Sequence, residues 1–146
     1  MAITHSVEIS RSPEDVFAYV DDLARHSEWQ EQVTAATVTP EGPTAVGTRS
    51  AETRRIGGRE QVMTYEVTQH EPPRLFAFRG IDGPIRAIGT ATLEPLDNGT
   101  RSRVTLELDF EGYGFGKLML PLVKSQASKQ VPKDQARLKQ LLEQSA

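Results

Sequence analysis

Apolar residues recur at every second position in several segments of this chain, and short turn signals separate those segments. The clearest example is 102–110, where Val104, Leu106, Leu108 and Phe110 alternate with polar residues. Successive side chains of a strand point to opposite faces, so this pattern is typical of a strand with one buried face. A chain built mainly of such segments must form a sheet that has one face to cover.

Six further segments are predicted to be strands from similar patterns: 3–9, 33–39, 46–56, 59–70, 75–78 and 85–94. Gly57-Gly58 and Asn98-Gly99 each predict a hairpin, because these residues adopt the backbone conformations that two-residue turns require. Strands joined by short hairpins pair antiparallel. We therefore expect an antiparallel sheet of about seven strands.

Two short helices are expected after the first strand. Ser12 is suited to cap a helix whose first residue is Pro13, and the acidic residues Glu14 and Asp15 complement a helix N-terminus. A second short helical piece is predicted from residue 22 towards residue 28. The chain would then turn into the sheet near residue 32.

One long helix is predicted for the C-terminal tail, where apolar residues repeat at spacings of three and four. Pro121 fits the first turn of this helix. Pro132 predicts a kink or a break near Val131, because proline cannot donate the helical hydrogen bond. The tail helix is the only element long enough to cover one face of the sheet, so the predicted fold class is α+β.

Length and composition restrict the class of protein further. The chain has 146 residues, no cysteine and a net charge of −3. The length fits one domain over residues 1–146, and the lack of cysteine excludes disulfides, thiolate metal ligands and cysteine nucleophiles. An acidic balance disfavours nucleic-acid binding, which requires a clustered basic face.

The chain also lacks the signals of export or membrane insertion. No segment has the ~18 consecutive apolar residues of a membrane span, and residues 1–8 have neither the basic nor the apolar region of a signal peptide. We therefore expect a cytoplasmic protein. Its oligomeric state is expected to be a monomer or a homodimer.

A series of short motifs resembles a known family over nearly the whole chain. In sequence order the motifs are Ser12–Phe17, Asp21–Leu23, Trp29, Val46–Thr48, Glu71–Leu75, Gly89-Thr90, Leu93–Pro95, Asn98–Arg101 and Leu118–Leu122. Together they resemble the polyketide cyclase/dehydrase-like branch of the START-like superfamily, also called Bet v 1-like or SRPBCC. The resemblance implies a helix-grip fold, in which the curved sheet wraps the C-terminal helix and leaves an apolar cavity between them.

The resemblance also implies a range of functions. Members of the superfamily bind lipids, polyketides and other hydrophobic small molecules, and some cyclise or dehydrate polyketides. It supplies no shared catalytic signature, and it implies no cofactor and no metal. We expect the following residues to line the cavity: Trp29, Met63, Tyr65, Phe76, Phe78, Ala91, Leu106, Leu120 and Val123. Trp29 is equally well interpreted as a plug beneath the short helices.

Tyr65 and Arg55 are the catalytic candidates. Tyr65 shares a face with Met63 and Val67, where its hydroxyl would orient a substrate carbonyl or donate a proton. The alternative is a core tyrosine whose hydroxyl bonds a backbone carbonyl. Arg54 and Arg55 point to opposite faces of one strand, so one of them faces the covered side and would stabilise an enolate or bind a carboxylate. The alternation leaves open which one, and edge protection is the alternative role.

Other polar groups carry weaker signals. The three histidines, His5, His26 and His70, show no metal-ligand spacing, and none is predicted to be catalytic. The segment 112–117 has a glycine pattern similar to a phosphate-binding loop, but its spacing is wrong, so it is predicted to be a flexible strand–helix connection. Phe76 and Phe78 occupy the inward face of their strand, which directs Arg79 outward.

Three functional hypotheses remain open at this point. The first is a hydrophobic-ligand site that acts as a polyketide cyclase or dehydratase. The second is a carrier or sensor with the same cavity and no chemistry. The third is a protein-interaction module with a filled cavity, for which the weak basic patch Lys133, Arg137 and Lys139 would offer a docking face. A solvated helix face explains that patch equally well.

Overall fold

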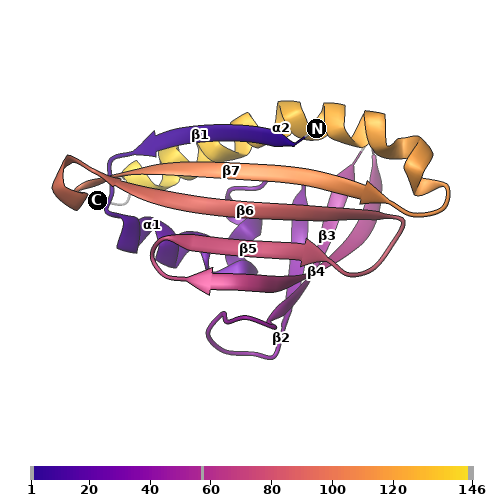
Figure 1. Ribbon diagram of the computed structural model, residues 1–146, viewed down its shortest axis with the longest axis horizontal. Coiled ribbons are helices and arrows are strands. Elements are labelled where there is room, and N and C mark those ends of the chain that lie inside the picture. Colours follow the sequence, from indigo (N-terminus) through magenta and orange to yellow (C-terminus); the bar gives the residue numbers. More distant parts are fainter. Residues whose placement is uncertain (1, 57, 145–146) are drawn as a thin grey trace.

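The computed structural model describes residues 2–56 and 58–144, and within them seven strands form one antiparallel sheet (Figure 1). The strands are β1 (Ile3–Ile9), β2 (Val33–Thr39), β3 (Arg49–Ile56), β4 (Arg59–Glu71), β5 (Leu75–Gly80), β6 (Ile85–Leu96) and β7 (Arg101–Gly112). Their spatial order is β1-β7-β6-β5-β4-β3-β2. This confirms the predicted sheet and its hairpin connections.

Two hairpin turns were predicted from the sequence, and the described residues include one of them in full. Between β6 and β7 a short 3-10 turn, η2 (Asp97–Gly99), places Asn98 at φ 59°, the left-handed conformation that an Asn-Gly turn predicts. The turn predicted at Gly57-Gly58 falls partly on a residue outside the described ones. The strands on either side of it pair up to Ile56 and Arg59.

Three helices accompany the sheet in the described residues: α1 (Pro13–Val20), the 3-10 helix η1 (Leu23–Glu28) and α2 (Gly116–Gln144). The side chain of Ser12 accepts a hydrogen bond of 3.2 Å from the Asp15 N–H, which confirms the predicted cap of α1. No helix in this part of the chain is both long enough and apolar enough to cross a bilayer.

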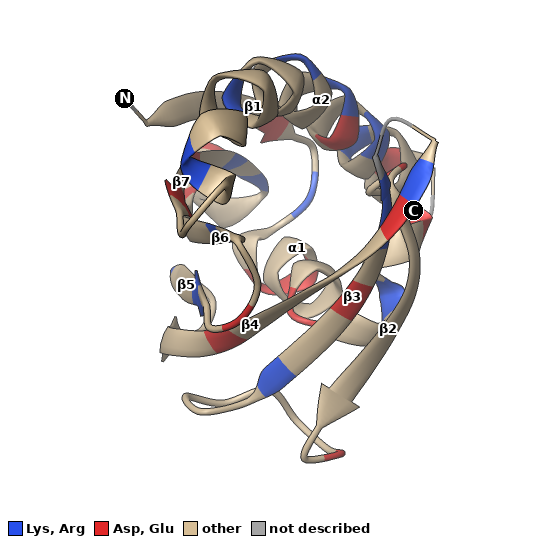
Figure 2. Ribbon diagram, turned by 90° about the vertical axis from the view of Figure 1, so that its right-hand side faces the viewer, with Lys and Arg blue, Asp and Glu red and all other residues tan. Residues whose placement is uncertain are grey.

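The sheet curves around its concave face, and α2 lies across the open side (Figure 2). The two halves of α2 have different surroundings. The C-terminal half buries Leu138 and Leu142 in a hydrophobic core together with α1, whose Phe17 and Val16 are also buried. The N-terminal half covers a cavity instead. The core therefore fills one end of the molecule and leaves a cavity at the other end.

The helix α2 runs unbroken through both prolines, so of the predicted kink or break near Val131 the break does not occur. Pro132 lies in the helix interior, and Pro121 lies in the second turn rather than the first. Just beyond Pro132 the helix buries Gln135 and Leu138. Most helical stability in proteins comes from such tertiary packing, and here it outweighs the hydrogen bond that proline cannot donate.

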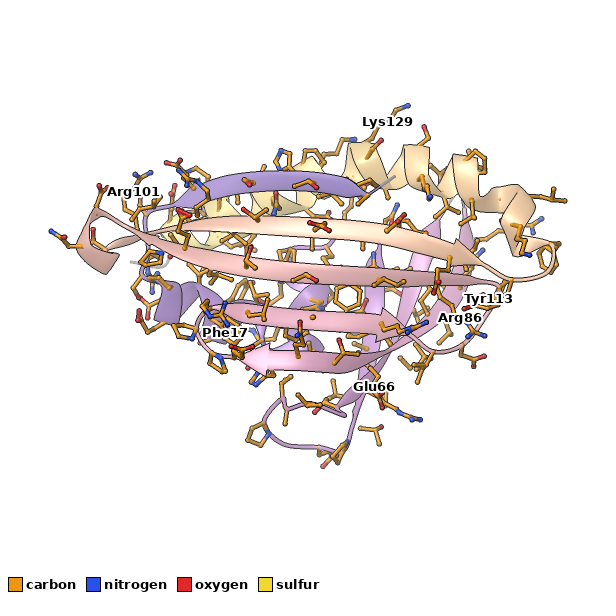
Figure 3. The ribbon with its side chains drawn as sticks, viewed as in Figure 1. Phe17, Glu66, Arg86, Arg101, Tyr113 and Lys129 are labelled. Atoms are coloured by element: carbon orange, nitrogen blue, oxygen red, sulfur yellow. The ribbon has the colours of Figure 1, made fainter. Side chains whose placement is uncertain are left out.

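The connection between β7 and α2 is closely packed rather than simply flexible. The N–H of Tyr113 donates a 2.8 Å hydrogen bond to the carbonyl of Pro84, in the turn between β5 and β6 (Figure 3). A Cβ atom added to Gly116 would lie 2.2 Å from the same carbonyl oxygen. Glycine is required there because two backbones approach closely. The segment 112–117 thus fixes the start of α2 at one end of the sheet.

Candidate functional site

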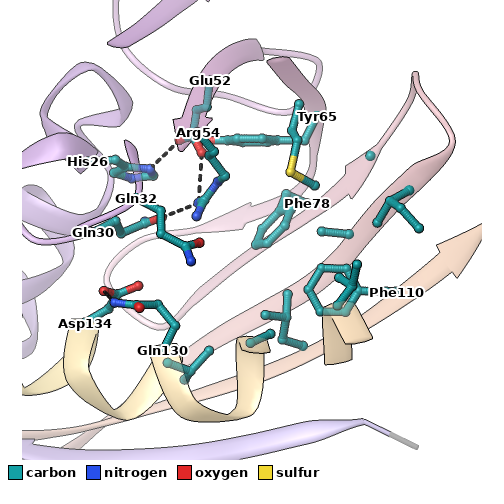
Figure 4. Close-up of a pocket in the computed structure, with 18 of the residues that line it drawn as sticks. His26, Gln30, Gln32, Glu52, Arg54, Tyr65, Phe78, Phe110, Gln130 and Asp134 are labelled. Atoms are coloured by element: carbon teal, nitrogen blue, oxygen red, sulfur yellow. Dashed lines mark hydrogen bonds and ion pairs between the residues drawn. The ribbon is translucent and has the colours of Figure 1, made fainter. Parts of the chain in front are cut away.

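A cavity of about 450 Å³ lies between α2 and the concave face of the sheet (Figure 4). Pockets that bind small molecules usually fall between ~300 and ~1,000 Å³. Eight of the nine residues predicted to line a cavity do so: Trp29, Met63, Tyr65, Phe76, Phe78, Ala91, Leu106 and Val123. Trp29 is half-buried and also packs against the hydrophobic core, so it has both of the roles considered for it.

Leu120 does not line the cavity, contrary to the sequence prediction. Met119, Leu122 and Val123 are the apolar residues of the first turns of α2 that do. Spacings of three and four residues keep side chains on one helix face, so the face that begins at Met119 continues through Leu122 and Val123. Leu120 lies one residue out of phase with Met119 and is half-buried beside the cavity.

One wall of the cavity is aromatic. The rings of Tyr65 and Phe78 have centroids 5.0 Å apart, and those of Phe76 and Phe78 are 6.2 Å apart. The Phe78 ring lies directly over Gly89 of the neighbouring strand, where an added Cβ would be 2.5 Å from the ring. A glycine on β6 therefore makes room for a large ring on β5, and the ring provides an apolar wall for a ligand.

The other end of the cavity is polar, and the buried carboxylate of Glu52 organises it. His26 Nδ1 lies 2.9 Å from Glu52 Oε2, and the Tyr65 hydroxyl donates to the same oxygen at 3.2 Å. Arg54 Nη2 donates to the other oxygen, Oε1, at 3.0 Å. Figure 4 shows His26, Arg54 and Tyr65 converging on Glu52 from two elements of the sheet and from η1.

The Glu52 network is charged. Burial alone would raise the pKa of Glu52, but the hydrogen bond from His26 and the charge of Arg54 outweigh it and lower the pKa to about 2. His26 Nε2 lies 2.8 Å from the Val20 carbonyl oxygen, so both ring nitrogens face acceptors.

Arg54, not Arg55, faces the cavity. The Arg54 side chain is 21% exposed, and it also donates to the Gln30 side-chain oxygen. Arg55, the candidate taken from the sequence, is 65% exposed and pairs with Glu60 on the outer face of the sheet. Neighbouring residues of a strand point to opposite faces, and the register of β3 assigns the inner face to Arg54. Arg79 points outward as predicted and lies 3.6 Å from Glu111.

Asp134 of α2 is a second buried carboxyl group at the polar end. Its Oδ1 accepts hydrogen bonds from the Gln130 side chain at 2.9 Å and from the Glu31 N–H at 3.3 Å. Burial raises the pKa of Asp134 above its usual 3.8, although these bonds and the charge of Arg54 lower it in part. A carboxyl group with a raised pKa can accept and return a proton more readily near neutral pH.

Tyr65 is part of this network rather than an isolated group. Burial, followed by the charge of Glu52, raises the pKa of Tyr65 well above its usual 10.0. Its hydroxyl proton is directed to a carboxylate and not to a backbone carbonyl. The tyrosine therefore holds Glu52 in place, while its ring contributes to the aromatic wall.

Several of these groups escaped the sequence analysis. His26, Glu52 and Asp134 carry no local motif, and they meet only because η1, β3 and α2 converge at one end of the cavity. One weak signal existed. Ser50, Glu52 and Arg54 share parity on β3, and two of the three are ionisable. In the described part of the chain, no three or more His, Cys, Asp or Glu residues lie together as a metal site would require.

Comparison with known proteins identifies the family to which this chain belongs. Residues 1–143 match the model of the family described as polyketide cyclase / dehydrase and lipid transport. The chain belongs to this family. No curated protein sequence matches it. The family membership confirms the resemblance given by the short motifs.

Solved structures share the fold at low sequence identity. The chain is similar to TTHA0849 from Thermus thermophilus, with a TM-score of 0.81 and 21% identity over 100% of this chain and 99% of that one. The aromatase/cyclase Zhui from Streptomyces sp. R1128 gives 0.82 and 14%, covering 98% and 93%. A START superfamily protein from Mycobacterium smegmatis gives 0.80 and 17%, covering 99% of each. This polyketide cyclase-like family member therefore has a START-like fold.

Proposed function

We propose that this protein binds a hydrophobic small molecule with an oxygen-bearing end and acts on it as a polyketide cyclase or dehydratase. The observation that carries the proposal is Arg54, which is held by Glu52 and Gln30 at the polar end of an otherwise apolar cavity. A fixed guanidinium at that position offers hydrogen bonds to a carbonyl oxygen without having to reorganise. The apolar remainder of the ligand would lie against the aromatic wall.

Ring closure of aldol type needs two functions that the polar end contains. A base removes a proton from the carbon next to a carbonyl, and a donor stabilises the resulting enolate oxygen. Asp134 has the chemistry of the base and Arg54 that of the donor. The enolate carbon then attacks a second carbonyl, a C–C bond forms, and the new alkoxide takes the proton from Asp134. Loss of water from the resulting alcohol would complete a dehydration.

The carrier or sensor hypothesis uses the same cavity without the proton transfer. It differs from the enzyme in what it requires of Asp134, because a carrier needs no base. The protein-interaction hypothesis depended on a filled cavity, and the open volume of about 450 Å³ gives it no support.

The first experiment is native mass spectrometry of the purified protein, followed by denaturing extraction. A stoichiometric small molecule would identify the ligand class, and its turnover would then be compared in Arg54→Gln and Arg55→Gln. We expect Arg54→Gln to lower kcat by about a hundredfold, as the loss of one oxyanion donor does, and Arg55→Gln to have no effect.

Three results would contradict the proposal in different ways. If turnover survives in Arg54→Gln and in Asp134→Asn, the proposed roles of these two residues are wrong. If the ligand binds but is not turned over, the protein is a carrier or sensor and not an enzyme. If no molecule copurifies and no lipid or aromatic polyketide raises the melting temperature, the ligand site itself is refuted.

A further inference from the structure

We propose that the cavity mouth docks on an anionic lipid bilayer through an apolar cap at the start of α2. This cap consists of Phe115, which directly precedes α2, and of Leu118 and Leu122 in the first turns of the helix. The inference concerns a surface outside the cavity, and it does not depend on whether the cavity is catalytic.

Exposed lining residues locate the mouth. Of the residues that line the cavity, Arg59, Gln61 and Leu122 are also exposed to solvent. They belong to the start of β4 and to the first turns of α2. Leu122 is therefore shared by the cavity wall and by the apolar cap, which makes the cap continuous with the interior.

The cap is unusually exposed for its composition. Leu118 is 84% exposed, Phe115 is 68% exposed and Leu122 is 59% exposed. Their spacings of three and four residues place them on one face. In the segment 115–123, Lys117 is the single charged residue. Single exposed apolar residues are ordinary, but a contiguous group beside a cavity mouth is typical of an interaction site.

Unpaired cations lie around the cap. Among the described residues, Arg59, Arg86 and Lys117 have no carboxylate partner. Arg86 lies over the ring of Tyr113, 4.0 Å from its centroid, beside the start of α2 (Figure 3). Three nearby acids are already engaged: Glu60 with Arg55, Asp109 with Lys124 and Glu111 with Arg79. Asp82 is the acid of this end that lacks a cation among the described residues, so the rim has a positive excess although the whole chain is acidic.

Charge argues against a second copy of the chain as the occupant. A two-fold dimer would bring identical surfaces together, so the cations of one rim would face those of the other. The shape of the cap argues for a fluid partner. Phe115 and Leu118 protrude at the start of the helix, and Leu122 joins them to the cavity mouth. Protruding apolar groups flanked by cations are suited to the interface of an anionic bilayer.

Vesicle flotation tests this docking with the full chain and two lipid compositions, phosphatidylcholine alone and phosphatidylcholine with phosphatidylserine. We expect binding to the anionic vesicles that weakens as salt is raised. Leu118→Glu should lower the partition coefficient at least about tenfold, since it removes a leucine that the bilayer would bury, and Lys117→Glu about fivefold or more. The matched controls Val46→Glu, at a residue that is 64% exposed on another loop, and Lys129→Glu should change nothing.

Failure of the docking is clearly recognisable. Absence of wild-type binding to the anionic vesicles would overturn it, and so would equal binding of Leu118→Glu and wild type at matched circular dichroism. If light scattering instead shows wild-type dimers that Leu118→Glu abolishes, a second copy covers the cap and the bilayer proposal is wrong. Ligand occupancy by native mass spectrometry is unaffected by these outcomes, so the proposed function is judged separately.

Discussion

Glu52 organises the polar end of the cavity, because three side chains from different positions converge on its carboxylate. Removing one partner from a buried ion pair leaves the other charge without compensation in a medium that solvates it poorly. Here the orphaned groups would be His26 and Arg54, both at the polar end of the cavity. Glu52 therefore stabilises the fold and also holds the arginine that faces the cavity.

The lowered pKa of Glu52 predicts an acid-sensitive contribution to stability. A carboxyl group whose pKa falls from 4.5 to about 2 on folding stabilises the fold above pH 4.5, and this contribution is lost as the pH falls towards 2. We expect Glu52→Gln to lower the free energy of unfolding by about 3 kcal/mol at neutral pH. The difference from wild type should shrink between pH 4.5 and 2.

Urea unfolding across that pH range measures the effect, with Glu60→Gln as the control. Glu60 is an exposed carboxylate on the outer face that pairs with Arg55, and such surface pairs contribute little. A difference between Glu52→Gln and wild type that stays constant down to pH 2 would mean that packing, and not the charge, is lost.

At the scale of the elements, the sequence predicted the sheet well and the site only in part. The strands follow from alternation, which needs no knowledge of the partner strand, and the strand residues that were predicted to line the cavity follow from the same rule. The polar end depends on which strand residues face inward at the register of β3, and on how η1 and α2 approach it. Alternation left open whether Arg54 or Arg55 faces inward, because a one-residue shift of phase inverts every side chain of a strand, and the register of β3 assigns the inner face to Arg54.

The unbroken helix α2 gives a second prediction. Pro132 lies in its interior, where it removes one backbone hydrogen bond, yet the helix continues to Gln144. Tertiary packing tolerates this loss but does not restore the bond. We therefore expect Pro132→Ala to raise the free energy of unfolding by about 1–3 kcal/mol, whereas Lys129→Ala on the exposed face should have no effect. Thermal unfolding measures both, and a destabilised Pro132→Ala would mean that the helix depends on the proline ring for packing.

For the molecule as a whole, volume that is left open as a cavity is volume that does not contribute packing to the core. The C-terminal half of α2 completes the core with Leu138, while the N-terminal half leaves about 450 Å³ open. Each apolar wall atom that faces this space lacks the packing contacts that a filled interior would give. We therefore expect the free energy of unfolding to be lower than that of a protein of the same size with a filled interior. The missing packing contacts are those of the cavity wall.

Filling the cavity should therefore exchange binding for stability. Ala127 lines the cavity from α2, and Ala136 lies exposed on the opposite side of the same helix. Leucine at residue 127 would place three additional carbons in open apolar space, so Ala127→Leu should raise the free energy of unfolding by about 1–2 kcal/mol and weaken ligand binding at least about tenfold. Ala136→Leu makes the same chemical change without entering the cavity and should alter neither quantity. If Ala127→Leu destabilises the fold while the copurified ligand remains bound at full occupancy, the ligand does not bind in the cavity. It would then be wrong to assign stability to the C-terminal half of α2 and ligand binding to its N-terminal half.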